Sequence, residues 1–346
     1  MKFLKKTNHI LVFIIIVLIL FYYGSSFFIT FGFGIFLAML MTPACNFLES
    51  HKINSVISAM LSTLIVFIVI VAISYLFAYQ ISLFLKDLPE LQEKTEAFVE
   101  NFQEQIFSVT GLSQEEQGSI IKERSSSILD MVESQMTDFF SGMVNTLLNF
   151  LLLFVYVFLF ILYRKKFMKF FTMLFESKER QQKTEMVLEK VSKIVHHYLW
   201  GRVQVMTILA VLYYPTFLIF DLPFAILLTI FGTLITVIPY LGPAVSGIVP
   251  MLFSILYLDN PFNIIIFCII IFIIQLIESY VLEPLIIGKE VKLNPLAVII
   301  AIISGGIIWG IAGMILFVPL FAAIKIISSH SKSLKPLEYL LENKRH

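Results

Sequence analysis

The sequence is poor in charged residues, and this scarcity restricts the class of protein more than any single motif does. Charged residues make up 14% of the 346 residues, hydrophobic residues make up 58%, and the mean hydropathy is +0.90. Average soluble domains carry about 25% charged residues. The net charge of only +1 also lacks the basic excess typical of nucleic-acid-binding proteins. We therefore expect an all-α, polytopic transmembrane protein with the lipid bilayer as a partner and no nucleic acid.

Cysteines and catalytic motifs are equally scarce. Cys45 and Cys268 stand alone without C-x-x-C spacing, which argues against a disulfide or a metal site. His196 and His197 are adjacent and so do not share a helix face. The chain has no glycine-rich nucleotide-binding loop, no H-E-x-x-H and no G-x-S-x-G motif. We expect that the protein is not an enzyme and that it holds no cofactor and no metal.

Long apolar runs are what the sequence has instead. A helix needs roughly 20 apolar residues to cross the hydrocarbon core of a membrane, and several runs reach or exceed this length. The runs and the charged segments between them predict six regions: N-terminal transmembrane helices (1–85), an acidic extracytoplasmic helical hairpin (86–138), a transmembrane helix (139–163), a basic cytoplasmic amphipathic helix (164–202), a C-terminal transport core with hairpins (203–327) and a cytoplasmic tail (328–346).

The distribution of charge predicts the orientation of these regions. Between Lys86 and Asp138 twelve residues are acidic and four are basic, whereas between Arg164 and Arg202 ten are basic and four are acidic. Segments rich in lysine and arginine stay in the cytoplasm. The rule places the lysine-rich N-terminus and the C-terminal tail in the cytoplasm as well.

The acidic segment has the pattern of two amphipathic helices. Phe98 and Phe102 lie on one apolar stripe among glutamates, and Ser113 with Glu116 fits a capping box that begins a second helix. The apolar stripe needs a partner. Packing within the hairpin, contact with the bilayer surface and contact with a second subunit all remain open.

Two stretches interrupt the apolar runs of the C-terminal half with proline, glycine and polar residues. They are VIPYLGP at Val237–Pro243 and QLIESYVLEPLIIGKEVKLNP at Gln275–Pro295. Hydrocarbon cannot hydrogen-bond a broken backbone, so such breaks occur where protein or a water-filled cavity satisfies the freed groups. Short runs between breaks are typical of re-entrant half-helices at transporter binding sites. The candidate substrate or ion path is Pro239, Tyr240, Gly242, Pro243, Gln275, Glu278, Glu283, Pro284, Asn294 and Pro295. The alternative for the first stretch is an ordinary turn at the membrane interface, with Tyr240 as an anchor.

Glu278 is the most informative single residue in this region. From Val203 to Leu282 the ionisable Asp, Glu, Lys and Arg residues are Asp221, Asp259 and Glu278, and the two aspartates lie beside prolines in predicted turns. Gln275 shares a helix face with Glu278 because it lies three residues earlier. A carboxyl group in apolar surroundings can take up and release a proton or bind a cation through oxygen. Alternatively, Glu278 reaches the interface or pairs with a nearby lysine.

Glycines in the last apolar run indicate close helix packing. Gly306, Gly310 and Gly313 are spaced i, i+4 and i+7, with Gly305 adjacent, so on one continuous helix they form a single smooth stripe. Small residues on a stripe allow membrane helices to approach closely. Static packing is the simpler interpretation, and sliding of one helix block past another is a second hypothesis.

These motifs together resemble the autoinducer-2 exporter family. The resemblance rests on VIPYLGP, on the Gln275, Glu278 and Pro284 spacing, and on the glycine-rich pair of segments that follows, and it spans about residues 200–327. ESYVLEP is similar to the sporulation-associated integral membrane protein subgroup. Where many members have asparagine two residues after the motif glutamate, this chain has Tyr280.

The resemblance implies a bacterial plasma-membrane transporter that forms a homo-oligomer, with a substrate-carrying block that moves against a scaffold. Our leading hypothesis is secondary transport that exports a small polar solute or a signalling molecule resembling autoinducer-2, driven by an ion gradient. Within transport, the alternative is a sodium (or lithium)/proton antiporter, whose substrate is a monovalent cation. Outside transport, the alternative is a membrane scaffold that organises partners through Phe98 and Phe102.

Overall fold

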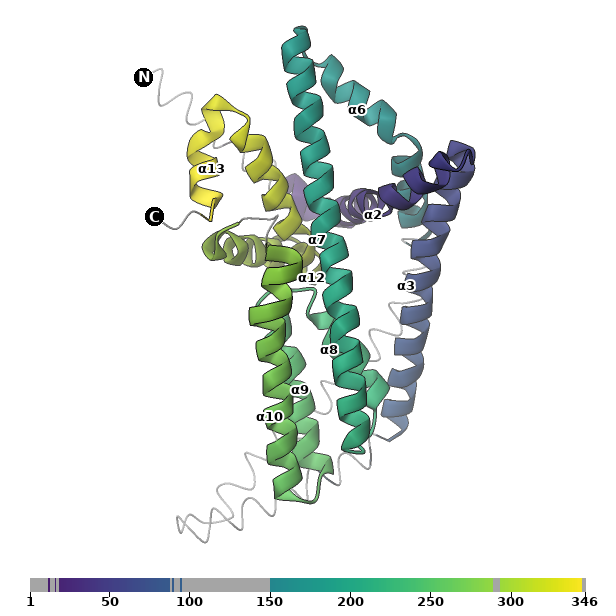
Figure 1. Ribbon diagram of the computed structural model, residues 1–346, viewed down its shortest axis with the longest axis vertical. Helices are drawn as coiled ribbons and strands as arrows, with labels where there is room; N and C mark the ends of the chain where they lie inside the picture. The colour runs from purple at the N-terminus through teal and green to yellow at the C-terminus, as the bar shows by residue number, and fades with distance from the viewer. Residues whose placement is uncertain are drawn as a thin grey trace.

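The chain forms an α-helical, multi-pass membrane protein (Figure 1). The computed structural model describes residues 19–87, 150–288 and 293–343, together with the single positions 12, 16, 89 and 94. Within these residues the only β-type pairing is one isolated bridge between Leu293 and Glu342. The predicted all-α fold is confirmed. The predicted acidic hairpin, with Phe98 and Phe102, lies almost wholly outside the described residues.

Five of the described helical segments are long and apolar enough to cross a membrane. They are α2 (Ser25–Ser50), α3 (Ser55–Lys86), α7 (Lys178–Ile219), α10 (Pro261–Ile277) together with the π-helix η1 (Glu278–Ile287), and α12 (Pro295–Ser329). Shorter helices complete the described part: Phe150–Leu162, α6 (Arg164–Met173), α8 (Ala225–Ile235), α9 (Leu241–Tyr257), the 3₁₀ turn η2 (Lys332–Leu334) and α13 (Lys335–Leu341).

The N-terminal half is a packed group of three helices. Asn54 begins α3 as its N-cap, because its side-chain oxygen accepts the backbone N–H of Val56 at 2.9 Å. The α2–α3 pair packs against the helix Phe150–Leu162 through Cys45, Ala59 and Val157, which are fully buried. An ion pair of 2.7 Å between Arg164 and Glu49 joins the start of α6 to the end of α2. This group is linked to the C-terminal half mainly through α2, which contacts both α7 and α12.

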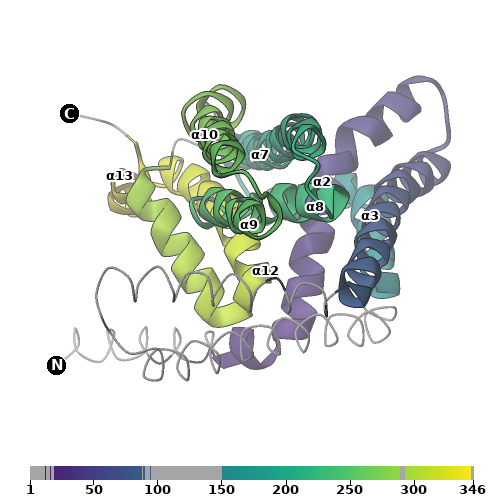
Figure 2. The ribbon, with the colours of Figure 1, turned by 90° about the horizontal axis from the view of Figure 1, so that it is seen from below.

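The C-terminal half is built around α7. This helix is continuous across the expected boundary between residues 202 and 203. Helices α8, α10 and η1 contact it directly, and α9 packs on α8 and α10 (Figures 1 and 2). The buried aromatic residues Tyr213, Phe217 and Phe267 form the centre of this core. The arrangement brings the two interrupted stretches of the sequence to the same helix.

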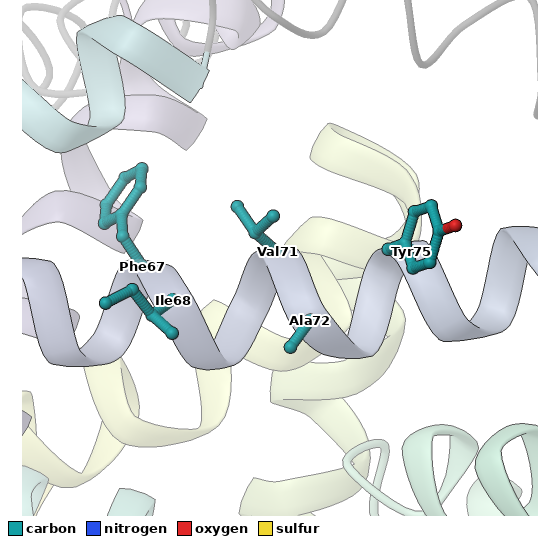
Figure 3. Close-up of a pocket in the computed structure, with 5 residues that line it drawn as sticks. All are labelled: Phe67, Ile68, Val71, Ala72 and Tyr75. Carbon is teal, nitrogen blue, oxygen red and sulfur yellow. The ribbon is translucent and has the colours of Figure 1, made fainter.

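The outward face of α3 is strongly apolar, as a helix surrounded by lipid requires. An apolar hollow of about 440 Å³ runs along it, lined by Phe67, Ile68, Val71, Ala72 and Tyr75 (Figure 3). The Tyr75 hydroxyl is the one polar side-chain group in this lining. The hollow therefore suits hydrocarbon rather than a polar solute, and the candidate site lies elsewhere.

Candidate functional site

Arg202 joins the two interrupted stretches. Its Nη1 donates to the Glu283 carboxylate at 2.7 Å and to the Thr236 carbonyl oxygen at 3.3 Å. The Arg202 and Glu283 side chains are 7% and 25% exposed, and the guanidinium also lies 5.6 Å from the Tyr198 ring. Gly201 permits the close approach, since a Cβ there would lie 3.1 Å from the Ile287 side chain. One side chain of α7 thus holds the end of α8 and the middle of η1.

The α8–α9 connection is a tight and strained turn, which we call the hairpin tip (residues 236–240). Tyr240 has φ 64° and ψ −50°, and the backbone N–H of Leu241 donates to the Pro239 carbonyl at 2.8 Å. This is a γ-turn with positive φ, a rare and strained form for a residue with a side chain. The glycine at 242 is required, because a Cβ there would lie 2.3 Å from the Ile235 carbonyl oxygen. Gly242 and Pro243 belong to the first turn of α9 rather than to the tip itself.

The second stretch changes helix type at Glu278. From Glu278 to Ile287 the backbone is a π-helix, and the N–H of Gly288 donates to the Glu283 carbonyl five residues earlier. Pro284 lies inside this segment and has no N–H to donate, so the regular α-helical ladder cannot continue through it. π-Helical segments are rare and occur often at functional sites. Sequence reasoning predicted an interruption here but not its geometry.

Glu278 is fully buried. Neither of its carboxylate oxygens has a hydrogen-bond partner among the described residues, which do not include Lys289 and Lys292. A buried charge without a partner costs several kcal/mol. In this conformation the carboxyl group is therefore suited to hold a proton or a cation. By contrast, the neighbouring Tyr280 is 77% exposed.

Gln275 is the centre of a neutral polar cluster one helical turn from Glu278. Its Nε2 donates to the Tyr213 hydroxyl oxygen at 2.5 Å and to Ser246 Oγ at 3.1 Å, so α10, α7 and α9 meet at this amide. Gly247 lies flat against the same side chain, because a Cβ there would be 3.1 Å from Gln275 Cγ. The Gln275 Oε1 atom is buried and has no partner among the described residues. Three acceptor oxygens on neighbouring turns, one from Gln275 and two from Glu278, are thus without a donor in the described part of the chain.

Asn294 and Pro295, also predicted for the path, have an evident structural task. The Asn294 side-chain oxygen accepts the N–H of Ala297 at 2.7 Å, which caps α12, and its amide donates to the Leu340 and Glu342 carbonyls at 2.6 and 3.3 Å. Pro295 occupies the first turn of α12, where no backbone donor is needed. This contact fastens α13 to the start of α12, and it leaves no free donor on the Asn294 amide for a substrate.

The single glycine stripe expected over Gly306, Gly310 and Gly313 is wrong, because α12 is not one continuous helix. Trp309 (φ −132°, ψ 16°) and Gly310 (φ 60°, ψ −143°) break it into a first arm (residues 295–308) and a second arm (residues 311–329) that folds back (Figure 2). Gly305 faces Gly313 across this crossing, and a Cβ on either would lie within 2.3 Å of the other's carbonyl oxygen. Gly310 provides the positive φ at the bend.

The bend of α12 is held by the N-terminal part of the chain. Trp309 Nε1 donates to the Phe21 carbonyl oxygen at 2.9 Å, and the Trp309 ring stacks on Phe21 with centroids 5.6 Å apart. Phe28 stacks on Phe21 at 4.5 Å and also lies 6.5 Å from the Trp309 ring, so the three rings form one aromatic group. The C-terminal half therefore contains two helical hairpins, α8–α9 and the two arms of α12.

Sequence reasoning missed Arg202, Thr236, Tyr213 and Ser246. Arg202 ends the run of charges in the basic cytoplasmic segment, immediately before the apolar run that begins at Val203, so the sequence pattern places it outside the membrane. Its one available signal was its position at the junction of a charged and an apolar segment. Hydroxyl residues are too common in membrane helices for their spacing to identify Tyr213 or Ser246.

A helical membrane protein with two helical hairpins, a strained turn and a buried carboxyl group beside a π-helix has the features of a transporter. The chain belongs to the AI-2E family of transporters, whose family model matches residues 11–333.

Two curated relatives come from Bacillus subtilis (strain 168). The chain is 34% identical over 143 residues to "Putative transport protein YrrI", covering 41% of this chain and 40% of that protein. It is 30% identical over 139 residues to "Putative transport protein YueF", covering 40% and 37%. A match to "Putative transport protein MT0215" of Mycobacterium tuberculosis (strain CDC 1551 / Oshkosh) is 35% identical over 85 residues, 25% of this chain and 23% of that protein. The matches span about two-fifths or less of the length of these relatives.

Proposed function

We propose that this membrane transporter is a secondary transporter that moves a small polar solute or signalling molecule out of the cell, coupled to protonation of Glu278. The proposal rests on one observation: Glu278 is fully buried, and among the described residues neither of its carboxylate oxygens has a partner. An ionisable residue at membrane depth is expensive, and its retention is typical of a proton or ion pathway. Orientation with both termini in the cytoplasm follows the distribution of lysine and arginine.

The surroundings of Glu278 fit a site that changes its occupancy. The carboxyl group begins a π-helix, Gln275 offers a neutral hydrogen-bonding amide one turn away, and the hairpin tip is linked to the same helix through Arg202. Protonated Glu278 needs no counter-charge, whereas ionised Glu278 needs one or must reach water. The two protonation states therefore favour different arrangements of η1, which is how a proton can be coupled to movement of a solute.

Flux measurements with Glu278→Gln test this proposal. Purified protein is reconstituted in proteoliposomes with an imposed pH gradient, and uptake of a panel of small polar solutes is measured. Glu278→Gln mimics a permanently protonated side chain, so gradient-driven accumulation should disappear. The matched control is Glu185→Gln, which removes the same charge from an exposed position of α7 and should leave accumulation unchanged. Accumulation that persists in Glu278→Gln would refute the coupling role.

A sodium or lithium/proton antiporter is the second candidate, and the three free oxygens favour it. Gln275 Oε1 and both Glu278 oxygens are buried acceptors without donors among the described residues, and oxygen atoms are the ligands that hard cations prefer. This function predicts that sodium or lithium dissipates an imposed pH gradient in proteoliposomes without any organic solute. A pH-sensitive dye inside the vesicles reports the loss of the gradient directly. A pH gradient that persists unchanged after sodium or lithium is added would exclude this function.

A scaffold without transport activity makes a contrasting prediction. Its partner surface would involve Phe98 and Phe102, which lie outside the described residues, and changes at Glu278 would then leave its cellular role intact. The buried carboxyl group and the strained hairpin tip have no task in that function, so we place transport first.

A further inference from the structure

Arg202 has more binding capacity than it uses in this conformation. Both interactions of its guanidinium with the two interrupted stretches are made by Nη1. The Nε–H group is buried and has no acceptor among the described residues. Arginine presents several donors in a fixed fork, so one guanidinium can serve two carboxylates. An unused buried donor on a fixed positive charge therefore indicates a second acceptor in another state.

Glu278 and Glu283 are arranged to compete for that donor. They are five residues apart in η1, and in a π-helix the i to i+5 hydrogen bond places such residues about one turn apart. In an α-helix the same spacing would separate them by about 140° around the axis. The π-helix thus aligns both carboxyl groups, and the charges of Arg202 and Glu283 both act on Glu278.

The two carboxyl groups differ in their access to water. The Glu283 side chain is 25% exposed and can be hydrated if Arg202 leaves it. Glu278 is fully buried, so in its ionised form it depends on a partner from the protein. Within the described part of the chain, the polar groups beside it on other turns and helices are neutral: Gln275 on α10 and the Tyr213 hydroxyl on α7. Among the described residues, Arg202 is the cation whose charge acts on Glu278.

We propose that Arg202 is a shared counter-ion, bound to Glu283 when Glu278 is neutral and to Glu278 when Glu278 has released its proton to water. The exchange moves the guanidinium along η1 and withdraws Nη1 from the Thr236 carbonyl, which frees the hairpin tip. Arg202 is in this respect a positioning residue, since it acts on the tip through the carboxylate that it holds. The inference builds on the proposed role of Glu278 in proton coupling.

A triple-mutant comparison of thermal stability tests the exchange without any transport measurement. The variants combine Arg202→Gln, Glu278→Gln and Glu283→Gln, and the Tm of each purified protein is measured at a pH high enough to ionise carboxyl groups. With Glu283 present, Arg202 always keeps one carboxylate partner, which is Glu278 when residue 278 is an ionised glutamate and Glu283 when it is glutamine. The coupling between Arg202 and residue 278 should therefore be small in this background. With Glu283→Gln in the background, Arg202 is left with Glu278. In this background, Arg202→Gln should lower Tm by about 5 °C more when residue 278 is glutamate than when it is glutamine. This difference is the coupling expected for one buried charge-assisted hydrogen bond.

Absence of that coupling would overturn the shared counter-ion, because a purely structural Arg202–Glu283 pair predicts none. A gain of coupling only in the Glu283→Gln background is not explained by general destabilisation, since the comparison cancels the cost of each single substitution.

Infrared difference spectroscopy provides a second test with wild-type protein, in case Glu283→Gln does not fold. Isotope-labelled arginine identifies guanidinium bands, and Glu278→Gln identifies the protonated carboxyl band of Glu278. As the pH is raised, loss of the Glu278 band should be accompanied by a shift of a guanidinium band, and both changes should be missing in Glu278→Gln. A guanidinium spectrum that stays constant while Glu278 loses its proton would refute the exchange. If the exchange is observed but Glu278→Gln retains gradient-driven flux, the proton-coupling function fails while the shared counter-ion stands.

Discussion

Replacing Gly305 with alanine should force apart the two arms of α12. The added Cβ would lie 2.3 Å from the Gly313 carbonyl oxygen and 2.5 Å from its carbon, whereas ordinary contacts begin at 3.4 Å. The opposing atoms are backbone and cannot rotate away, so the arms must separate by about 1 Å. Overpacking of this kind costs about 1–3 kcal/mol, and the higher helix propensity of alanine returns about 0.5–1 kcal/mol. We expect a net loss of about 1–2 kcal/mol.

Gly306→Ala is the matched control for this prediction. A Cβ there would meet the terminal methyl group of Met314 at 2.7 Å, and that flexible side chain can move. The control should be neutral or slightly stabilised, because it gains helix propensity without a backbone clash. Thermal unfolding in detergent measures both variants, with about 2–4 °C expected per kcal/mol. A Gly305→Ala protein that melts at or above the temperature of Gly306→Ala would refute the backbone crossing.

Three further predictions concern the hairpin tip, the α12 cap and the polar cluster. Tyr240→Gly should raise Tm by relieving the positive φ, which costs of order 1–3 kcal/mol, and an unchanged or lower Tm would show that the turn is not strained. Asn294→Ala should cost about 0.5–2 kcal/mol through loss of the cap on Ala297, and it should speed proteolytic removal of α13; equal cleavage rates in variant and wild type would contradict this role. Gln275→Leu should cost about 1–3 kcal/mol by leaving the buried Tyr213 hydroxyl without its donor, measured by thermal unfolding, and full stability would indicate that the cluster is replaceable.

The helical membrane fold could be predicted because it depends on composition and run length. Apolar runs long enough to cross the bilayer must form helices there, since no other open structure satisfies the backbone in hydrocarbon. The interruptions at Pro239 and Pro284 could also be predicted from the sequence, because proline removes a backbone hydrogen-bond donor wherever it stands. The prediction of a single glycine stripe was wrong because the helix is not continuous. Spacing along the sequence assumes a continuous helix, and nothing local to Gly310 indicates that the chain reverses at that residue.

The candidate site was predictable only in part. Glu278 and Gln275 were identified because a carboxyl group and an amide are conspicuous in an apolar run. The donor that completes the site comes from α7, 81 residues before Glu283. No local pattern links two residues at that separation, and Arg202 resembles the end of an ordinary basic segment.

The sequence by itself determined that the chain crosses a membrane as helices, that the apolar runs are interrupted near Pro239 and Pro284, and that Glu278 is a carboxyl group within an apolar run. These properties follow from the transfer of side chains and backbone between water and hydrocarbon, which acts on each segment separately. Only the tertiary structure decided that the breaks at the hairpin tip and η1 meet at Arg202, and that α12 folds back through Gly305 and Gly313. Those outcomes depend on contacts between side chains and backbones from segments that are distant in sequence. Packing of that kind has no pattern that can be recognised along the chain.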